Sequence, residues 1–524
     1  MKREKPHQET ADSSGHRNRK NRSLGVISAL VLAAAGCSSR SAPAAAPTTS
    51  AITETQSTAL PTTTKPVRFA PTLIARPCPP GYPANASCST FTVLANRQNP
   101  TSPKIALLVA VLKATGKERQ PDALVIPGGG PGFSSFSRVE LAQSPFNVER
   151  DLVLYDQRGT GGAVPSLDCP EYDALAVTEL QSAAPYTKEH ATRVSVLNRC
   201  IADAKSAGID LADYNTNASA ADLDELRVAL GYDQWNLLGV SYGARLSLAT
   251  MRLFPKGIRA VILDSVYNVT DGGTAANLAS AQRALDQLVS DCAASSPCVS
   301  AHGSLAVKLQ KIRRVFNATP AEFDIDLKIG TGSQHFVITG DDVMSGLFGA
   351  FYDSTLIPEL PGLIDDLADG NTGSIASLLQ GGLARNDGLA DVMAFATNCA
   401  DNAGLVTHAA DGAAESNPGA YGLLVSPGCP AEWPATSSDF NQPVVSDIPS
   451  LVLAGSYDPV TPPASSKRAA DYLSRSTFVQ VASSGHGVTG LNDCIFALQL
   501  RFLAKPDEVL DTSCATALPK PAFR

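Results

Sequence analysis

The feature that most constrains the fold is a series of six short apolar runs, each ending in or just before Gly, Ser or Asp. Strands buried on both faces of a parallel sheet have this continuous apolar character, and helical patterns such as residues 218–231 separate several of the runs. Residues 88–96 and 104–114 come earlier and are typical of antiparallel strands. The pattern predicts an α/β fold with a mostly parallel central sheet flanked by helices and chemistry at the carboxyl ends of its strands. The six runs are ALVIPGG, RDLVLYDQRG, WNLLGVS, IRAVILDS, PSLVLAG and TFVQVAS.

The alternation lapses between residues 270 and 442. Three segments there have helical patterns, and a hairpin-like segment, FDIDLKIGTGSQHFVIT, interrupts them. An insert of this length in a sheet fold is typical of a lid over the active face. We therefore expect a mainly helical lid at 270–442 that divides the core into residues 67–269 and 443–524.

The first 36 residues have the pattern of an export signal. A basic stretch ending in RNRKNR precedes the apolar run LGVISALVLAAA, and Gly36 and Cys37 follow. The run is about 12 residues, or roughly 18 Å as a helix, too short for a bilayer core of about 30 Å. AAGC resembles a bacterial lipobox, which implies acylation of Cys37 and anchoring on the outer face of the cell membrane. The alternative is a cleaved signal and release. Residues 37–66 are rich in Ser, Thr, Ala and Pro, which predicts a flexible tether.

Composition excludes several classes of protein. The chain has 524 residues, 44% hydrophobic and 18% charged, as expected of a packed globular protein. Beyond Gly36 there remain 35 basic and 47 acidic residues, a net charge of −12, so we expect no nucleic-acid partner. CxxC and HExxH do not occur, and we expect neither a metal nor a cofactor.

Ten of the eleven cysteines remain after Cys37, and an even number in an oxidising compartment predicts disulfides. Pairing cannot be deduced from sequence alone, and sequence neighbours give the expected pairs. These are Cys78 with Cys88, Cys169 with Cys200, Cys292 with Cys298, Cys399 with Cys429, and Cys494 with Cys514.

Residues Gly239 to Gly243 match GxSxG, the strained strand-to-helix turn that presents a nucleophilic serine. The motif alone is weak because two glycines and a serine coincide often by chance. Here, however, the strand-like WNLLGV precedes it and the helical ARLSLATMRLF follows it. This context predicts Ser241 as the nucleophile of an α/β-hydrolase fold; a glycine-rich turn without chemistry is the alternative.

A serine hydroxyl needs a general base, and the base needs a carboxylate that orients it. In this fold the order along the chain is Ser, acid, His. Asp458 closes the run LVLAGSYD, and His486, in SSGHG, follows it 28 residues later. We predict Asp458 as the acid and His486 as the base, with Asp471 and Asp493 as alternative acids.

The oxyanion formed on attack needs backbone N–H donors. Tyr242, directly after the nucleophile, supplies one, and Gly129 or Gly130 in PGGGPG supplies the other. No GK[ST] follows, so this is not a phosphate-binding loop. In the next loop, DQRG, we expect Asp156 and Arg158 to brace the site as a buried ion pair rather than to bind substrate.

Together these residues resemble the tripeptidyl aminopeptidase and proline iminopeptidase branch of the α/β hydrolases, common as exported proteins and lipoproteins in actinobacteria. The resemblance covers roughly residues 76–514 and implies removal of short peptides from free amino termini, with triad roles on Ser241, Asp458 and His486. The matching pieces are GGPG at 129–132, DQRGTGG at 156–162, DLDELRVALGYDQWNLLGVSYGAR at 222–245, SYDPVTP at 456–462 and SSGHG at 483–487.

The chain departs from that branch at two positions, because Gly128 stands where His is frequent and Gly162 where Arg is common. Such enzymes hold the substrate ammonium with acidic side chains from the lid. No motif selects among the candidates, which include Asp271, Asp341, Asp342 and Asp401.

The sequence thus predicts a serine hydrolase that acts on a peptide or a small acyl substrate through an acyl-enzyme, most specifically an exopeptidase. A carboxylesterase, lipase or thioesterase with the same triad is the nearest alternative. A surface binding lipoprotein that kept the fold without its chemistry is the alternative from another class. The sequence indicates no oligomeric state.

Overall fold

The computed structural model describes residues 69–136, 138, 140, 144–272, 274–325, 333–375, 378–379, 388–403, 405, 428–430 and 432–524. The predicted export signal, Cys37 and the tether fall outside these residues. Among the described helices, none combines the length and apolar character needed to cross a bilayer.

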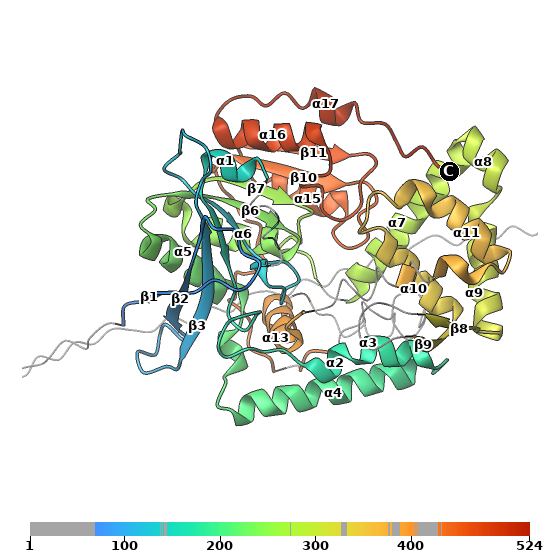
Figure 1. Ribbon diagram of the computed structural model, residues 1–524, viewed down its shortest axis with the longest axis horizontal. Helices are drawn as coiled ribbons and strands as arrows, with labels where there is room; N and C mark the ends of the chain where they lie inside the picture. Colours follow the sequence, from blue (N-terminus) through green and yellow to red (C-terminus); the bar gives the residue numbers. More distant parts are fainter. Residues whose placement is uncertain are drawn as a thin grey trace, which may run out of the picture. The chain divides into compact units, whose positions relative to one another are not determined.

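A nine-stranded sheet in the order β1-β2-β3-β5-β4-β6-β7-β10-β11 forms the centre of the protein (Figure 1). The strands β1, β2 and β3 pair antiparallel, as does β3 with β5, while the other six pair parallel. Each of the six predicted apolar runs forms one of these parallel strands, so the predicted α/β fold is confirmed. The strands are β1 Thr72–Arg76, β2 Ala86–Leu94, β3 Lys104–Leu112, β4 Leu124–Ile126, β5 Leu152–Tyr155, β6 Trp235–Val240, β7 Ile258–Asp264, β10 Ser450–Gly455 and β11 Ser476–Val481.

Helices cover both faces of the sheet because successive strand residues point to opposite faces. In β6, Leu237 belongs to the cluster that includes Leu223 of α5, whereas Leu238 belongs to the cluster that includes Ile495 of α16. Asn215 caps α5 by accepting from Ala218 N–H. The core helices are α1 Phe146–Glu149, α5 Thr216–Leu230, α6 Tyr242–Leu253, α15 Pro463–Ala470, α16 Asp493–Ala504 and α17 Ser513–Thr516.

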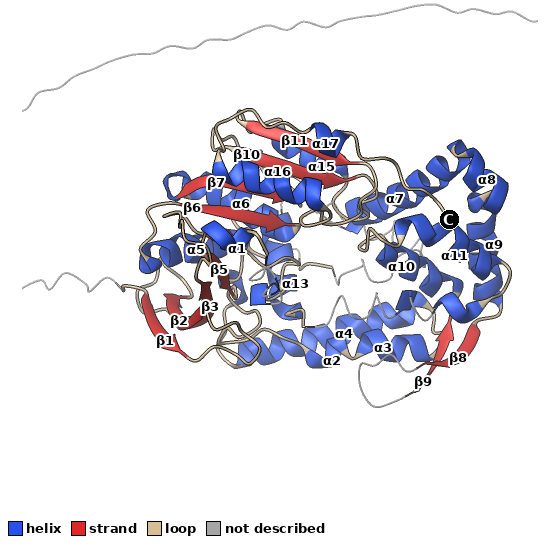
Figure 2. Ribbon diagram, turned by 45° about the horizontal axis from the view of Figure 1, so that its top comes forward, coloured by secondary structure: helices blue, strands red, loops and turns tan. Residues whose placement is uncertain are grey.

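The insert has a hydrophobic cluster of its own, built mainly from α7 to α11 and the β8–β9 hairpin. Figure 2 shows these helices grouped on the side toward which the arrows of the parallel strands point. The elements are α7 Thr274–Ala294, α8 Ser296–His302, α9 Leu305–Ala318, β8 Ala321–Ile325, β9 Gln334–Ile338, α10 Gly340–Ala350, α11 Leu360–Ala368 and α13 Asp391–Asn402.

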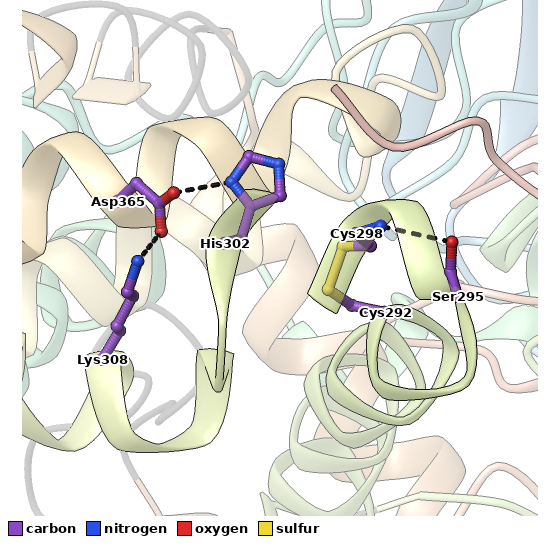
Figure 3. The surroundings of a disulfide bond; sticks show 6 residues. All are labelled: Cys292, Ser295, Cys298, His302, Lys308 and Asp365. Carbon is purple, nitrogen blue, oxygen red and sulfur yellow. Dashed lines mark hydrogen bonds and ion pairs between the residues drawn. A yellow bond between two sulfur atoms is a disulfide. The ribbon is translucent and has the colours of Figure 1, made fainter. Parts of the chain in front are cut away.

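A disulfide and several polar contacts link the helices of the insert (Figure 3). The disulfide Cys292–Cys298 joins α7 to α8, where Ser295 caps the start of α8. Asp365 of α11 lies 2.6 Å from His302 Nδ1 and also accepts from Lys308 of α9. One carboxylate therefore links three helices.

In two segments the structure adds to the predicted division of the chain into a core and a lid. Helix α13 lies within the expected lid, yet its Val392, Met393 and Ala396 pack in the same cluster as the sheet and α6. Residues 170–206, which precede the nucleophile, add the helices α2 Pro170–Asp173, α3 Leu175–Thr178 and α4 Tyr186–Ser206. Short 3-10 turns lie at Glu179–Gln181, Leu211–Asp213, Pro255–Gly257, Ile357–Glu359 and Thr372–Ser374.

The structure joins the same five cysteine pairs that sequence proximity suggests. Cys169–Cys200 ties the start of α2 to α4, and Cys399–Cys429 ties α13 to the chain that leads back to the core. The others are Cys78–Cys88, Cys292–Cys298 and Cys494–Cys514.

Candidate active site

Ser241 lies in the tight turn between β6 and α6, with φ 60° and ψ −120°. This left-handed conformation is strained for a residue with a side chain. The flanking glycines permit it: a methyl group at Gly239 would lie 2.3 Å from Gly243 O, and one at Gly243 would lie 2.9 Å from Pro127 O. The GxSxG pattern is therefore a steric requirement of this turn.

Asp458 and His486 meet because they follow the neighbouring parallel strands β10 and β11. His486 Nδ1 lies 2.9 Å from Asp458 Oδ2. Asp458 is fully buried and also accepts from the backbone N–H groups of Val460 and Thr461 through Oδ1. Burial alone would raise the pKa of Asp458, but His486 and these donors outweigh it and hold the pKa below its usual value.

The loop that carries His486 lies against the nucleophile turn. A methyl group at Gly487 would lie 3.7 Å from Val240 Cγ1, and Val240 directly precedes Ser241. Asp264, the last residue of β7, accepts from Val488 N–H at 2.8 Å and from Thr489 N–H at 2.6 Å. Sequence reasoning did not single out Asp264, although a buried strand that ends in an acid was a signal for it.

The insert holds the same loop from its other side. His486 N–H donates to Phe351 O at 3.1 Å, and the Tyr352 ring lies 4.8 Å from the imidazole. A methyl group at Gly485 would lie 1.6 Å from Phe351 O, so the first glycine of SSGHG is required. Arg283 of α7 donates to the backbone oxygen of Asp458 at 2.6 Å. The acid and the imidazole are thus both held by elements of the insert.

The two expected sources of oxyanion donors also come together. Tyr242 begins α6, so its N–H has no partner within the helix. A methyl group at Gly129 would lie 3.6 Å from Val240 O, and Gly130 has φ 104°. The departure at Gly128 has a steric reason, because a methyl group there would lie 2.2 Å from Phe133 O.

The DQRG loop braces the site, though not through the pair that the sequence suggested. Arg158 binds Asp222 of α5 with two 2.8 Å hydrogen bonds, and both side chains are fully buried. Asp156 instead accepts from Ser134 and from Gly162 N–H, and burial raises its pKa to about 6. A methyl group at Gly162 would lie 2.8 Å from the Leu108 side chain.

The four lid acids named from the sequence all have partners. Asp271 pairs with Arg468, Asp341 with Arg313 and Asp401 with Arg245, while Asp342 accepts from Thr339, the N-cap residue of α10. The alternative catalytic acid Asp471 pairs with Lys467, and Asp493 is exposed at the start of α16.

Asp391, which sequence reasoning missed, is different. It is 7% exposed, and its Oδ2 has no hydrogen-bond partner among the residues that the structure describes. Burial, with the carboxylates of Asp173 and Asp168 nearby, raises its pKa to about 8. Ala390, just before it, donates its N–H to Gly132 O at 3.1 Å. The backbone directly before Asp391 therefore adjoins the loop that contains Gly129 and Gly130.

Within the described part of the chain, one group of side chains has a metal-binding arrangement: Cys169, Glu171 and Cys200. Its two sulfur atoms are joined in a disulfide. A thiolate is what binds a metal, so this group does not form a metal site.

Two family models match the chain. The model described as alpha/beta hydrolase fold matches residues 122–357, which contain Ser241, and the model described as TAP-like protein matches residues 423–514, which contain Asp458 and His486. The chain belongs to the TAP-like branch of the α/β hydrolases. The family resemblance seen in its motifs is therefore confirmed.

Named relatives of this TAP-like hydrolase include peptidases. Serine protease Hip1 of Mycobacterium tuberculosis is 31% identical over 231 residues, which cover 41% of this chain and 43% of Hip1. Tripeptidyl aminopeptidase of Streptomyces coelicolor is 32% identical over 196 residues, 36% of each chain. Carboxylesterase B of M. tuberculosis is 30% identical over 226 residues, 41% of this chain and 43% of that protein. The chain thus spans less than half the length of these relatives.

Among solved structures, a meta-cleavage product hydrolase from Pseudomonas fluorescens matches with a TM-score of 0.38 and 12% identity over 77% of this chain and 96% of that one. The fold assignment rests on the sheet order and the family models instead.

Proposed function

We propose that this TAP-like hydrolase is a serine exopeptidase that releases short peptides from free amino termini through an acyl-enzyme. The observation that carries the proposal is the contact between Asp458 Oδ2 and His486 Nδ1 at 2.9 Å, together with the packing of the His486 loop against the Ser241 turn. An imidazole bound to a carboxylate through Nδ1 leaves Nε2 free to accept a proton, which is what activation of a serine requires.

In this mechanism Ser241 Oγ attacks the scissile carbonyl and its proton passes to His486 Nε2. The N–H groups of Tyr242 and of Gly129 or Gly130 hold the negative oxygen. The C–N bond breaks, the leaving amine takes the proton from His486, and an ester to Ser241 remains. Water then attacks that ester, its proton passes through His486 back to Ser241 Oγ, and the acid product leaves. No cofactor takes part.

We assign recognition of the substrate ammonium to Asp391. A buried carboxyl oxygen without a partner, such as Asp391 Oδ2, is costly unless a cation binds it, and a peptide amino terminus is such a cation. A pKa of about 8 favours the protonated carboxyl group at neutral pH when no ammonium is bound. A bound ammonium favours the carboxylate, so binding displaces that proton.

Asp391→Asn is expected to raise KM for a tripeptide p-nitroanilide with a free amino terminus by about tenfold or more, because a neutral amide replaces the counter-charge. Hydrolysis of the acetylated peptide stays unchanged. Asp286→Asn, at an exposed acid on α7, is the control and leaves both substrates unaffected. Equal losses for free and acetylated peptides would refute the assignment.

The same variant has a predicted effect on stability. The pKa of Asp391 is raised from 3.8 to about 8 in the folded protein, so the wild type loses stability as pH rises between these values. Asp391→Asn removes this loss, and its free energy of unfolding at pH 8 exceeds that of the wild type by about 1–3 kcal/mol. Urea unfolding at pH 5 and pH 8 measures the difference.

An esterase is the second candidate, favoured by the relative named carboxylesterase B. A peptide library with free and blocked amino termini, assayed beside p-nitrophenyl esters, separates the two. Cleavage confined to free amino termini supports the exopeptidase. Hydrolysis of esters alone, with every peptide intact, supports the esterase.

We also propose that the protein is exported and lipid-anchored through Cys37, on the grounds of the basic and apolar pattern before Gly36. The wild type expressed in an actinobacterial host is expected to enter the detergent phase of Triton X-114, and Cys37→Ala to stay in the aqueous phase. Wild-type protein found in the aqueous phase or the medium would contradict lipid anchoring.

A further inference from the structure

We propose that α13 of the insert positions both donors of the oxyanion hole, and that Asp401 and Thr216 act as positioning residues through the side chain of Tyr242. This rests on the proposed acyl-transfer chemistry at Ser241.

The segment that leads into α13 lies on the glycine-rich loop. Ala390 N–H donates to Gly132 O at 3.1 Å, and Leu389 forms an isolated antiparallel bridge with Phe133. A methyl group added at Gly130 would lie 3.3 Å from Leu389 Cδ1, and one added at Gly132 would lie 2.8 Å from the same atom. The loop that holds Gly129 and Gly130 is thus packed directly against Leu389, and its position depends on where α13 begins.

The other end of α13 contacts the nucleophile turn through the side chains of Thr216 and Tyr242. Asp401 Oδ2 accepts from Thr216 Oγ1 at 2.5 Å, and Thr216 Oγ1 lies 2.8 Å from the Tyr242 hydroxyl. Thr216 has one hydroxyl proton, which goes to Asp401, so Tyr242 donates to Thr216. These three side chains are at most 1% exposed. The N–H of Tyr242 is one of the two oxyanion donors, and the ring of the same residue is linked through Thr216 to α13.

The nucleophile turn needs such an anchor. Ser241 has a strained backbone, and such strain persists only where the surroundings over-determine it. Relaxation of the Ser241 backbone dihedrals would turn the peptide plane between Ser241 and Tyr242, and the Tyr242 N–H would then point in another direction. The buried Tyr242 side chain opposes that rotation because its hydroxyl is held at the far end.

Helix α13 is itself firmly held. Arg245 lies 3.7 Å from Asp401 and donates to Asn402 Oδ1 at 3.1 Å. Asn441 donates to Asp401 O at 2.8 Å, and Cys399 is bonded to Cys429. These contacts fix the position of α13, so the helix can set the positions of the oxyanion donors.

The competing explanation is that Asp401 contributes only to stability, through its ion pair with Arg245. Thr216→Val separates the two, because it removes the hydroxyl link at nearly constant volume and leaves that ion pair in place. Thr250→Val is the matched control: Thr250 is also a buried threonine, and its hydroxyl donates to Leu246 O within α6. Tyr242→Phe breaks the same link from its other end and serves if Thr216→Val does not fold.

The assays are hydrolysis of p-nitrophenyl acetate and inhibition by phenylboronic acid, which forms a tetrahedral adduct with an active serine. Thr216→Val is expected to lower kcat about tenfold, a fraction of the loss on removing an oxyanion donor outright, and to raise the inhibition constant by a similar factor. KM stays within about threefold, because acylation and deacylation both form the oxyanion. Thr250→Val changes neither quantity.

The inference is overturned if Thr216→Val and Tyr242→Phe keep wild-type kcat and boronate affinity. It is also overturned if losses in kcat merely follow a fall in melting temperature that Thr250→Val shares. Wild-type protein that reacts with neither probe would instead refute the hydrolase chemistry.

Discussion

Ser241→Ala is expected to lower kcat for p-nitrophenyl acetate by about 10⁴- to 10⁶-fold, the loss seen when a serine nucleophile is removed. The variant retains the imidazole and the oxyanion donors, so it binds the ester but forms no acyl-enzyme. Because alanine is smaller than serine and carries the same Cβ, the turn between β6 and α6 is unchanged.

Stopped-flow and steady-state hydrolysis measure this loss, and the burst of p-nitrophenol disappears. Ser247→Ala is the control, since Ser247 is a buried serine of α6 whose hydroxyl donates to Gly243 O. That control keeps activity within about twofold, as ordinary substitutions away from a site do. A Ser241→Ala protein with a tenth of wild-type activity would remove Ser241 as the nucleophile.

Asp458→Asn is expected to lower kcat about 10⁴-fold with little change in KM. Asp458 Oδ1 accepts from Val460 N–H at 2.9 Å and from Thr461 N–H at 2.8 Å. These donors fix the amide oxygen of an asparagine at the Oδ1 position, so its NH₂ group faces His486 Nδ1. The imidazole must then accept at Nδ1 and carry its proton on Nε2, where it no longer accepts the serine proton.

The kcat of Asp458→Asn is compared with that of Asp507→Asn, which alters an exposed acid paired with Arg475 and keeps wild-type activity. Circular dichroism verifies that the variant is folded. If Asp458→Asn is as active as the control, another group orients the imidazole and the acid is wrongly assigned.

The fold and the central residues were predictable because each signal is local. The parallel strands appear as apolar runs, and Ser241, Asp458 and His486 each follow one of them. In a parallel sheet all strand ends of one kind lie at one edge, so the order of the runs was enough to bring distant residues together.

The contacts that hold the site were not predictable, since each joins segments that no local pattern relates. Arg158 finds Asp222 on α5 rather than Asp156 beside it in sequence. His486 is held by Phe351 O and Asp401 reaches Thr216, across 135 and 185 positions of chain respectively. Asp391 lies in no motif and is distinguished only by its burial and by an Oδ2 atom without a partner among the described residues.

The measurement that tests the central claim most directly is labelling by a fluorophosphonate, followed by intact mass spectrometry and peptide mapping. The account predicts one adduct per chain, on Ser241, absent from Ser241→Ala and formed at least about 100-fold more slowly by His486→Ala, which lacks the base. An adduct on another residue, or folded wild-type protein that stays unlabelled while a control hydrolase reacts, would contradict it.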